Sequence, residues 1–339
     1  MARTLALAAL LLAAGGPARA AETVRLGNLK FAHYGAVSYM KEHCRKFGLD
    51  VQEIVFPKGI DIFPAIVKGE VDLAASAADA AIANRAGGGQ IYAVAGFAKG
   101  GARLVAASGQ SIGKVADLKG KKVGVARGGA QEVLLLAELA KAGLTWSDKP
   151  GKDVLVLYLP FADLNQALMA RNIDAMCQSE PYSSQAINRK FGVELLKPYD
   201  TPIGEPIRAL VITEKLYKER RDVARRFLLC FVEATKKFID DPKLAEKYVR
   251  ENMFKSQISA EDYQDAIGNS PFSYDITTEH VQITTDLMAK YGVGKMATPP
   301  KASDWVKLDL LAEAKKQLKI DQPAAAPKKA APAKKVKKG

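Results

Sequence analysis

Short β-prone runs alternate with helical patterns along the first two thirds of the chain. The runs of strand length lie at residues 24–29, 51–56, 72–75, 91–97, 122–126, 154–159 and 174–177. Between them, apolar residues recur at helical spacing, as at Val133, Leu136 and Ala140 before Gly143. This alternation predicts βα units and a mainly parallel sheet, and so an α/β fold.

The pattern changes after Pro206, where one β-prone run at residues 207–213 is followed by helical patterns through residue 318. Segments 57–76 and 160–178 also echo each other. Each runs from a proline through an aspartate and a short apolar helix to a Val-Asp or Ile-Asp strand start. The echo suggests two similar lobes. The late helices then fit a chain that crosses back to the first lobe and wraps it.

We therefore expect two α/β lobes joined by two crossings, near residues 104–108 and 207–211, that form a double-stranded hinge. The first lobe takes residues 21–106 and 209–322, and the second takes residues 107–208. Residues 1–20 and 323–339 lie outside both lobes.

The N-terminal segment has the features of an export signal. Arg3 supplies a positive charge, residues 5–14 are apolar, and Ala18, Arg19 and Ala20 form a small-x-small cleavage site. We expect cleavage before Ala21 and a periplasmic protein. No lipid anchor is expected, because no cysteine lies near the cleavage point.

The C-terminal segment, residues 323–339, holds six lysines and no acidic residue. Its Ala, Pro and Lys composition cannot bury a core, so we expect a disordered basic tail. Without the six lysines of the tail and the two arginines of the signal, 42 of the 50 basic residues remain, against 37 acidic residues. The net charge of +13 is thus largely a property of the tail, and no nucleic-acid partner is expected. Attraction of the tail to an anionic surface is the alternative.

Three cysteines do not make a disulfide framework. Cys44 shares a helical stripe with Met40, and Cys230 shares one with Phe227. Both positions are typical of a core, and we expect free buried thiols there rather than a Cys44–Cys230 bridge. Cys177, on a short buried strand, is expected to be inert.

Candidate binding residues lie in the loops after the predicted strands, because ligands of open α/β folds bind beyond the carboxyl ends of the strands. Phe31 could equally be a core residue, and Ser76 could equally cap the helix that follows it. Asp79 is assigned to the first turn of that helix. The candidates in the first lobe are Phe31, His33, Tyr34, Ser76 and Ala77.

The second lobe offers a glycine-rich turn between a strand and a helix. A helix N-terminus presents unpaired amides and a positive dipole end to an anion, and an arginine here adds a cation. An ordinary tight turn is the alternative. The residues concerned are Arg127, Gly128, Gly129 and Gln131.

Two further charged residues are candidates. Glu180 either neutralises a helix end or holds a donor group of a ligand, and Tyr182 lies beside it. Arg208, in the return crossing, is either an ion-pair partner at the hinge or a second contact for an anion.

Signatures of catalysis are missing from the sequence. His33, His43 and His280 have no metal-ligand spacing, and no GxSxG elbow occurs. No metal or other cofactor is implied. The sequence therefore favours a binding protein over an enzyme.

Several motifs together resemble one known family. Over residues 24–211 the chain is similar to the nitrate/sulfonate/taurine class of ABC-transporter substrate-binding proteins, whose relatives also bind pyrimidine precursors of thiamine. The most specific motif is the VADLKGKKVGV run at residues 115–125, which many binding proteins of this general fold share. The other motifs are Phe56-Pro57-x-Gly59, Gly69-x-Val71-Asp72, and Asp174-Ala175 leading into Glu180-Pro181-Tyr182.

The resemblance implies a type II periplasmic-binding fold with a ligand in the cleft between lobes. It also implies a monomer that delivers a small-molecule solute to a permease and ATPase of the inner membrane, or alternatively docks onto a sensor. Family contacts would map onto the loop after the first strand, Ser76 and Ala77, the turn at residues 127–131, and Glu180 with Pro181. Ser179 departs from the pattern, because sulfonate binders often have a large aromatic residue there.

The expected solute is a small organic anion, such as a sulfonate or carboxylate. One alternative is a neutral or cationic nitrogen heterocycle, such as a pyrimidine precursor. Another is an enzyme that resembles thiamine-pyrimidine synthases. That enzyme is disfavoured because those synthases depend on a cysteine-rich iron segment, whereas the three cysteines here are far apart.

Overall fold

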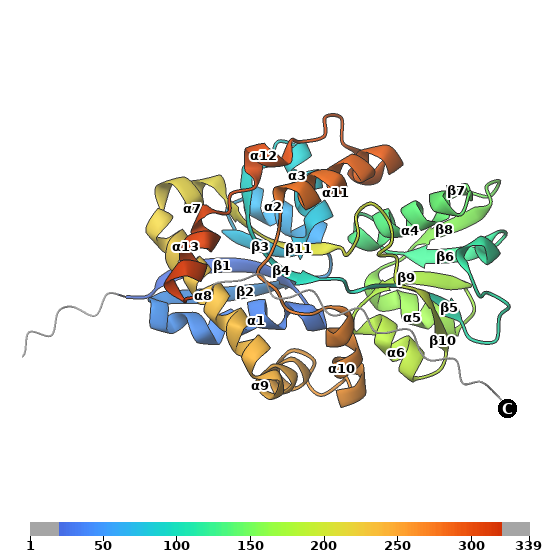
Figure 1. The fold of residues 1–339 in the computed structure, drawn as a ribbon, viewed down its shortest axis with the longest axis horizontal. Helices are drawn as coiled ribbons and strands as arrows, with labels where there is room; N and C mark the ends of the chain where they lie inside the picture. The colour runs from blue at the N-terminus through green and yellow to red at the C-terminus, as the bar shows by residue number, and fades with distance from the viewer. Residues whose placement is uncertain (1–19, 321–339) are drawn as a thin grey trace, which may run out of the picture.

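The computed structural model describes residues 20–320 of the chain, in which two β-sheets lie side by side (Figure 1). The predicted export signal, apart from Ala20, and the predicted basic tail lie outside these residues. The predicted α/β class is confirmed. Within the described range, no helix is both long and apolar enough to cross a membrane.

The first sheet has five strands in the order β2-β1-β3-β11-β4. β1 pairs in parallel with β2 and β3, and β11 runs antiparallel between β3 and β4. The return strand β11 therefore completes a sheet begun at the start of the chain. The strands are β1 (Glu22–Leu29), β2 (Leu49–Phe56), β3 (Leu73–Ala77), β4 (Ile91–Lys99) and β11 (Ile207–Thr213).

The second sheet has six strands in the order β10-β5-β9-β6-β8-β7. β6 pairs in parallel with β8 and β9, whereas β5 runs antiparallel to β9 and β10. Both sheets are thus mixed, and each contains parallel and antiparallel pairs. The strands are β5 (Ala102–Ala107), β6 (Lys122–Val125), β7 (Trp146–Ser147), β8 (Val154–Tyr158), β9 (Ala175–Ser179) and β10 (Gly192–Leu196).

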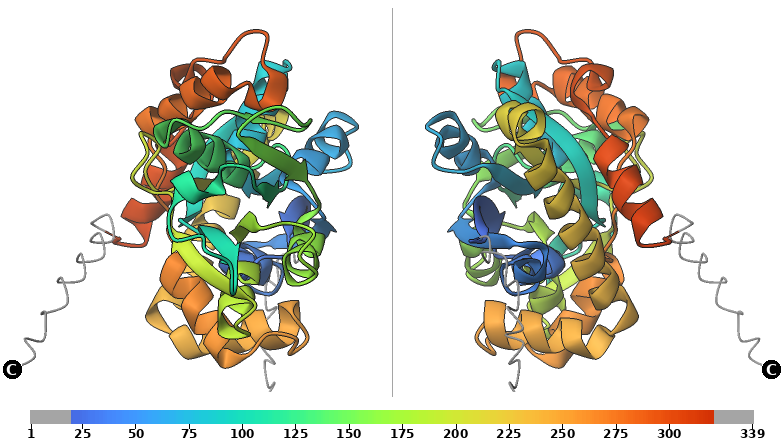
Figure 2. Two further views of the ribbon diagram at one scale, coloured as in Figure 1. Left: turned by 90° about the vertical axis from the view of Figure 1, so that its right-hand side faces the viewer. Right: turned by 90° about the vertical axis from the view of Figure 1, so that its left-hand side faces the viewer.

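Helices cover both sheets. Those between the strands are α1 (Gly35–His43), α2 (Ile62–Val67), α3 (Ala78–Ala86), α4 (Ala130–Lys141), α5 (Phe161–Met169) and α6 (Tyr182–Asn188). Those after β11 are α7 (Glu214–Glu219), α8 (Arg221–Asp240), α9 (Pro242–Lys247), α10 (Ala260–Asn269), α11 (Thr278–Tyr291), α12 (Ala302–Trp305) and α13 (Asp309–Gln317). Most of the late helices return to the first sheet, but α10 contacts α6 and α11 contacts α4. These two helices lie on opposite sides of the molecule (Figure 2).

The internal echo in the sequence corresponds to matching contacts in the two sheets. The side chain of Asp72 accepts the backbone N–H of Arg25 at 2.9 Å, and that of Asp174 accepts the backbone N–H of Lys122 at 2.8 Å. The backbone N–H of each aspartate donates back to the carbonyl of the same partner. Each aspartate thereby fixes the start of a strand that follows a short helix, β3 in one lobe and β9 in the other.

The first crossing between the sheets lies at Gly100 and Gly101, earlier than the expected residues 104–108. The reason is that residues 102–107 form β5, a buried strand inside the second sheet. Both glycines have positive φ angles, +71° and +76°. A Cβ atom on Gly100 would lie 2.3 Å from the carbonyl oxygen of Asn269, so the close approach also requires glycine.

The return crossing occupies residues 197–206, between β10 and β11. The two crossings touch, since the backbone N–H of Gly100 donates to the carbonyl of Pro206 at 2.8 Å. We therefore propose lobe boundaries at residues 100–101 and 197–206, in place of the boundaries at residues 106/107 and 208/209 that the sequence suggested.

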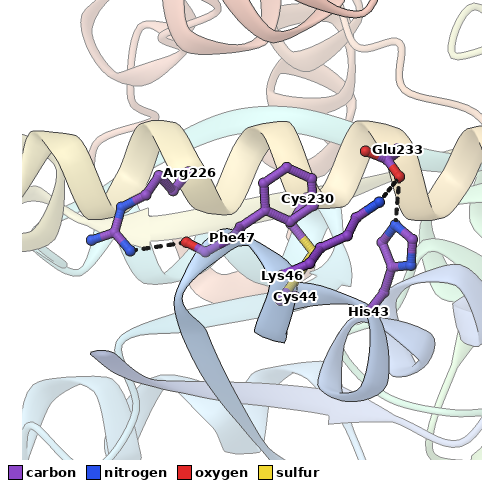
Figure 3. The surroundings of a disulfide bond; sticks show 7 residues. All are labelled: His43, Cys44, Lys46, Phe47, Arg226, Cys230 and Glu233. Carbon is purple, nitrogen blue, oxygen red and sulfur yellow. Dashed lines mark hydrogen bonds and ion pairs between the residues drawn. A yellow bond between two sulfur atoms is a disulfide. The ribbon is translucent and has the colours of Figure 1, made fainter. Parts of the chain in front are cut away.

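The prediction of free thiols at Cys44 and Cys230 is wrong, because the two residues form a disulfide (Figure 3). Cys44 follows α1, Cys230 lies in α8, and these two helices pack together. Their Cα atoms are 5.4 Å apart, a normal distance for a disulfide. The helical stripes identified both residues as core, but they could not show that two stripes 186 residues apart face each other.

Polar contacts surround the disulfide on the surface of α8 (Figure 3). Glu233 lies 3.1 Å from Nε2 of His43 and forms an ion pair with Lys46. Arg226 donates to the carbonyl of Phe47 at 3.0 Å. The disulfide and these contacts together fix the late helix α8 against the N-terminal part of the first lobe.

Removal of the disulfide should lower the free energy of unfolding by about 2–5 kcal/mol, because the bond restricts the unfolded chain over a long loop. The double variant Cys44→Ala/Cys230→Ala and the fully reduced wild type should show similar losses in urea unfolding. Reductant should not change the double variant further, which controls for effects on Cys177. A wild-type protein equally stable before and after complete reduction would contradict this role.

Candidate functional site

A narrow cleft lies between the lobes, where the carboxyl ends of strands from both sheets meet. It is lined by residues at or just after the ends of β1, β2 and β3 in the first lobe and of β6, β8 and β9 in the second, and by one residue of β11. Its cavity volume is about 30 Å³, enough for a few water molecules. The arrangement follows the general rule for the location of ligands in α/β folds.

Most of the residues predicted from the sequence line this cleft. They are Phe31, Tyr34, Ala77, Arg127, Gly128, Gly129, Gln131 and Arg208. Four predicted residues are not among the lining residues: His33, Ser76, Glu180 and Tyr182.

Arg208 is a buried cation at the base of the cleft. It is the second residue of β11, and antiparallel pairing places it opposite Ala77, the last residue of β3. Its side chain is 2% exposed. The Nη1 atom has no hydrogen-bond partner, and no salt bridge involves Arg208, among residues 20–320. Burial of a guanidinium whose Nη1 atom lacks an acceptor is unfavourable, so Nη1 marks a position where an acceptor would be stabilised.

His33 supports Arg208 from behind the cleft. The Nε atom of Arg208 donates to Nε2 of His33 at 3.2 Å, and both side chains are buried. Burial, and then the charge of Arg208, hold the pKa of His33 well below its usual range. The imidazole is therefore neutral and acts as an acceptor, which orients the guanidinium without neutralising it.

Asp79 is the other buried charged group at the cleft. It lies in the first turn of α3 with 1% of its surface exposed, and within the described chain neither carboxylate oxygen has a hydrogen-bond partner. Burial raises its pKa to about 7, and the Arg208 guanidinium opposes this increase. Asp79 can therefore either carry a proton or accept a donor group from a ligand near neutral pH.

The glycine-rich turn before α4 is less available to an anion than its sequence suggested. The backbone N–H of Gly128 donates to the carboxylate of Glu132 at 2.6 Å. This contact places a buried negative charge at the start of the helix. The Gln131 side chain is buried and donates to the carbonyl of Gly101 at 3.5 Å, so it links α4 to the first crossing.

Arg127 lies at the rim of the cleft, and its charge is engaged by neighbours. Its guanidinium stacks 3.5 Å from the ring centroid of Tyr158 and pairs with Asp148 at 3.2 Å. The side chain is half exposed. A solvated, paired guanidinium binds an anion less strongly than a buried one that has no partner.

Glu180 is fully buried behind the cleft wall. Its Oε1 atom lies 2.7 Å from Nε of Arg103, and its Oε2 atom accepts from the hydroxyl and the backbone N–H of Ser184 at 2.6 and 3.1 Å. Burial raises the pKa of Glu180, and the charge of Arg103 opposes this increase. The protein thus supplies Glu180 with a cation, Arg103, in an ion pair that is not a hydrogen bond at Oε1, and with two donors from Ser184 at Oε2. Ser76 is also buried and donates to the carbonyl of Ala77.

An outer aromatic pocket adjoins the cleft. It has a cavity volume of about 250 Å³ and contains Tyr182, with Lys30 at its wall. Phe31 and Phe161 line both this pocket and the cleft. The ring of Phe31 lies edge-on to those of Phe161 and Tyr182, with centroids 5.2 and 6.0 Å away. The outer pocket therefore offers an apolar surface next to the buried charges.

Sequence reasoning missed several lining residues. Phe161 follows the strand at residues 154–159 and could have been found by the rule that selected the other loops. Lys58 and Ile60 lie in the loop after β2, for which the same rule applies. The sequence places Asp79 in the first turn of a helix, and only its burial and its lack of hydrogen-bond partners within residues 20–320 distinguish it from an ordinary first-turn aspartate.

The chemistry that the cleft offers comes from one buried guanidinium, one buried carboxyl group and aromatic rings. Together these groups can bind a charged or polar molecule that has an apolar portion. Within residues 20–320, no group of three His, Cys, Asp or Glu side chains lies close enough to hold a metal ion.

Sequence comparisons identify related proteins. Residues 19–250 match the model of the NMT1-like family. A protein of Escherichia coli (strain K12) named as an aliphatic sulfonates-binding protein is 34% identical over 146 residues, which cover 42% of this chain and 44% of that protein. A protein of Brachyspira hyodysenteriae (strain ATCC 49526 / WA1) named as an ABC transporter periplasmic binding protein is 22% identical over 282 residues, 77% of this chain and 78% of that protein. The match therefore spans less than half of the first relative.

Solved structures share the fold. The periplasmic nitrate-binding protein NrtA from Synechocystis PCC 6803 superposes with a TM-score of 0.74 at 19% sequence identity, covering 91% of this chain and 92% of that one. This likeness confirms the expected periplasmic-binding fold, and the sequence matches confirm the family resemblance.

The raised pKa of Asp79 predicts a pH-dependent stability. Between about pH 4, where an unfolded aspartate titrates, and about pH 7, the folded protein retains a proton that the unfolded chain releases. Folding should therefore become less favourable as the pH rises through this window. In the variant Asp79→Asn this cost is absent, so its free energy of unfolding relative to wild type should increase from pH 5 to pH 8.

Urea unfolding at a series of pH values measures this difference. Asp163→Asn, which replaces an exposed aspartate in the first turn of α5, should follow the wild-type profile and serves as the control. Parallel profiles for wild type and Asp79→Asn would show that Asp79 titrates normally.

Proposed function

Because the chain belongs to the NMT1-like family, we propose that it is the periplasmic solute-binding component of an ABC importer. The names of the two curated relatives support this class, since one is named as an aliphatic sulfonates-binding protein and the other as an ABC transporter periplasmic binding protein. The cleft lined by residues from both lobes supports the capture of one small molecule. The function is binding and delivery of a solute, not catalysis.

The proposed solute class rests on the buried Nη1 atom of Arg208, which has no hydrogen-bond partner within residues 20–320. Neutral His33 orients this guanidinium, and Asp79, whose pKa burial raises to about 7, offsets its charge only in part near neutral pH. An anionic group of a ligand would supply the missing compensation and a charge-assisted hydrogen bond. The solute is therefore a small organic anion, such as a sulfonate or a carboxylate.

The other groups of the cleft suit the remainder of such a solute. Asp79 can accept a hydrogen bond from an amine or ring nitrogen. Phe31, Phe161 and Tyr182 can cover an apolar portion that extends into the outer pocket. In this assignment Arg208 and Asp79 take the roles that the sequence suggested for Arg127 and Glu180, because the latter pair already has protein partners.

The periplasmic location has two supports in this chain. The N-terminal sequence predicts an export signal. The disulfide between Cys44 and Cys230 is typical of oxidising compartments outside the cytosol. The partners are then a permease and an ATPase of the inner membrane, which receive the solute from a monomeric binding protein.

Loss of Arg208 should weaken the binding of an anion. A hydrogen bond to a charged group contributes roughly 1.5–3 kcal/mol, so Arg208→Gln should reduce affinity at least about tenfold. Isothermal titration calorimetry with methanesulfonate, taurine and acetate measures this effect. Arg45→Gln removes the same charge from an exposed position on the first lobe, away from the cleft lining, and should bind like wild type.

A nitrogen heterocycle is the alternative solute, and Asp79 is the observation that favours it. The pyrimidine portion of thiamine is therefore included in the titrations. Tight binding of this compound that is lost in Asp79→Asn but retained in Arg208→Gln would contradict the assignment of an organic anion.

A further inference from the structure

Arg103 lies at the centre of a cluster of three carboxylates. It is the second residue of β5, directly after the first crossing, and its side chain is 3% exposed. Its Nε atom lies 2.7 Å from Glu180, its Nη1 atom 3.1 Å from Glu194, and its Nη2 atom 2.8 Å from Asp265. These four residues are not among those that line the cleft.

The three carboxylates come from different lobes. Glu180 follows β9 and Glu194 lies in β10, and both strands belong to the second sheet with Arg103. Asp265 lies in α10, whose residues Tyr263 and Ala266 pack in an apolar cluster of the first lobe. Of the three pairs made by Arg103, therefore, the one with Asp265 links the two lobes.

A second polar contact links the same elements. Asn188, at the end of α6, donates to Asp262 of α10 at 3.0 Å. Figure 1 shows α6 and α10 side by side below the crossing. The C-terminal residue of α10, Asn269, accepts the backbone N–H of Gly101 at 2.9 Å, so this helix also borders the point about which the lobes would rotate.

The cluster is arranged so that the interlobe pair can break without leaving a buried charge unpaired. Arg103 keeps Glu180, which is fully buried, and Glu194 in any relative position of the lobes, because all three belong to the second lobe. Asp265 is 34% exposed and can be solvated when released. Breaking a buried pair by removal of its only partner is costly, but that cost does not arise here.

We propose that Asp265, acting through Arg103, is a positioning residue that favours the closed arrangement of the lobes and so controls the retention of solute. This inference rests on the proposed function, in which the lobes close around a solute. A modest interaction free energy is enough for this role, because any contact made only in the closed arrangement shifts the equilibrium between open and closed lobes. A partly exposed pair of this kind changes that balance by about two- to fivefold.

The chain provides a matched control. Asp265→Asn and Glu194→Gln each remove one negative charge from Arg103 at sites of similar exposure, 34% and 38%, but only the first removes a pair between lobes. The amide oxygen introduced by Asp265→Asn would remain an acceptor for Nδ2 of Asn269, which contacts Oδ1 of Asp265 at 3.0 Å. Differences between the two variants therefore report the link between lobes and not the charge of the cluster.

The distance between the lobes can be measured without any ligand. Spin labels on Val67→Cys in α2 and Met169→Cys in α5 occupy exposed positions in different lobes, and Cys177 is buried and Cys44 and Cys230 are bonded, so these three do not compete for label. In this background, Asp265→Asn should raise the ratio of open to closed populations about two- to fivefold. Glu194→Gln should match the unmodified background.

Asn188→Ala removes the hydrogen bond to Asp262 and should shift the distances between the spin labels in the same direction. This variant tests the proposal even if Asp265→Asn does not fold. Asp265→Glu keeps the charge and should restore the original distribution. Identical distributions for Asp265→Asn, Asn188→Ala and background would overturn the proposal, as would equal shifts in Asp265→Asn and Glu194→Gln. These measurements use ligand-free protein, so their outcome is independent of the binding experiments. The distances can contradict the role of Asp265 while anions still bind, and anion binding can be absent while the distances support that role.

Discussion

The buried guanidinium of Arg208, which forms no salt bridge within residues 20–320, is the feature on which the proposed function depends. Arg208 reaches the base of the cleft because β11 returns to the first sheet antiparallel to β3 and sets Arg208 opposite Ala77. Its hydrogen-bond partner, His33, is held neutral by its surroundings, so the positive charge remains. Burial of this charge lowers the stability of the folded protein, because the guanidinium loses its hydration. An anionic ligand would form a charge-assisted hydrogen bond with it, so the buried charge favours binding rather than stability.

The sequence predicted the alternation of strands and helices because period-2 and period-3.6 patterns record which faces are buried. It also located most of the cleft, since the loops after parallel strands meet at one edge. Asp72 and Asp174 marked the duplicated units, and their matching hydrogen bonds explain why both positions need an aspartate.

The sequence could not reveal which distant groups meet. The disulfide joins two helical stripes whose facing depends on the packing of α1 against α8. The sequence makes Glu180 a candidate ligand contact, but in the structure Arg103, from another strand, forms an ion pair with it. The sequence does not distinguish Asp79 from an ordinary helix residue, whereas the structure shows that it is buried and has no hydrogen-bond partner in the described part of the chain. In each case the deciding fact is a contact, or a missing contact, across the tertiary structure.

The proposed role of Arg208 is to hold an anionic group of the solute. A crystal structure of the protein released gently from its native periplasm, with the solute that remains bound, would show whether it does. We expect a solute in the cleft with an anionic oxygen about 2.7–2.9 Å from Nη1 of Arg208. A solute held elsewhere, or one that presents no anionic group to Arg208, would contradict it.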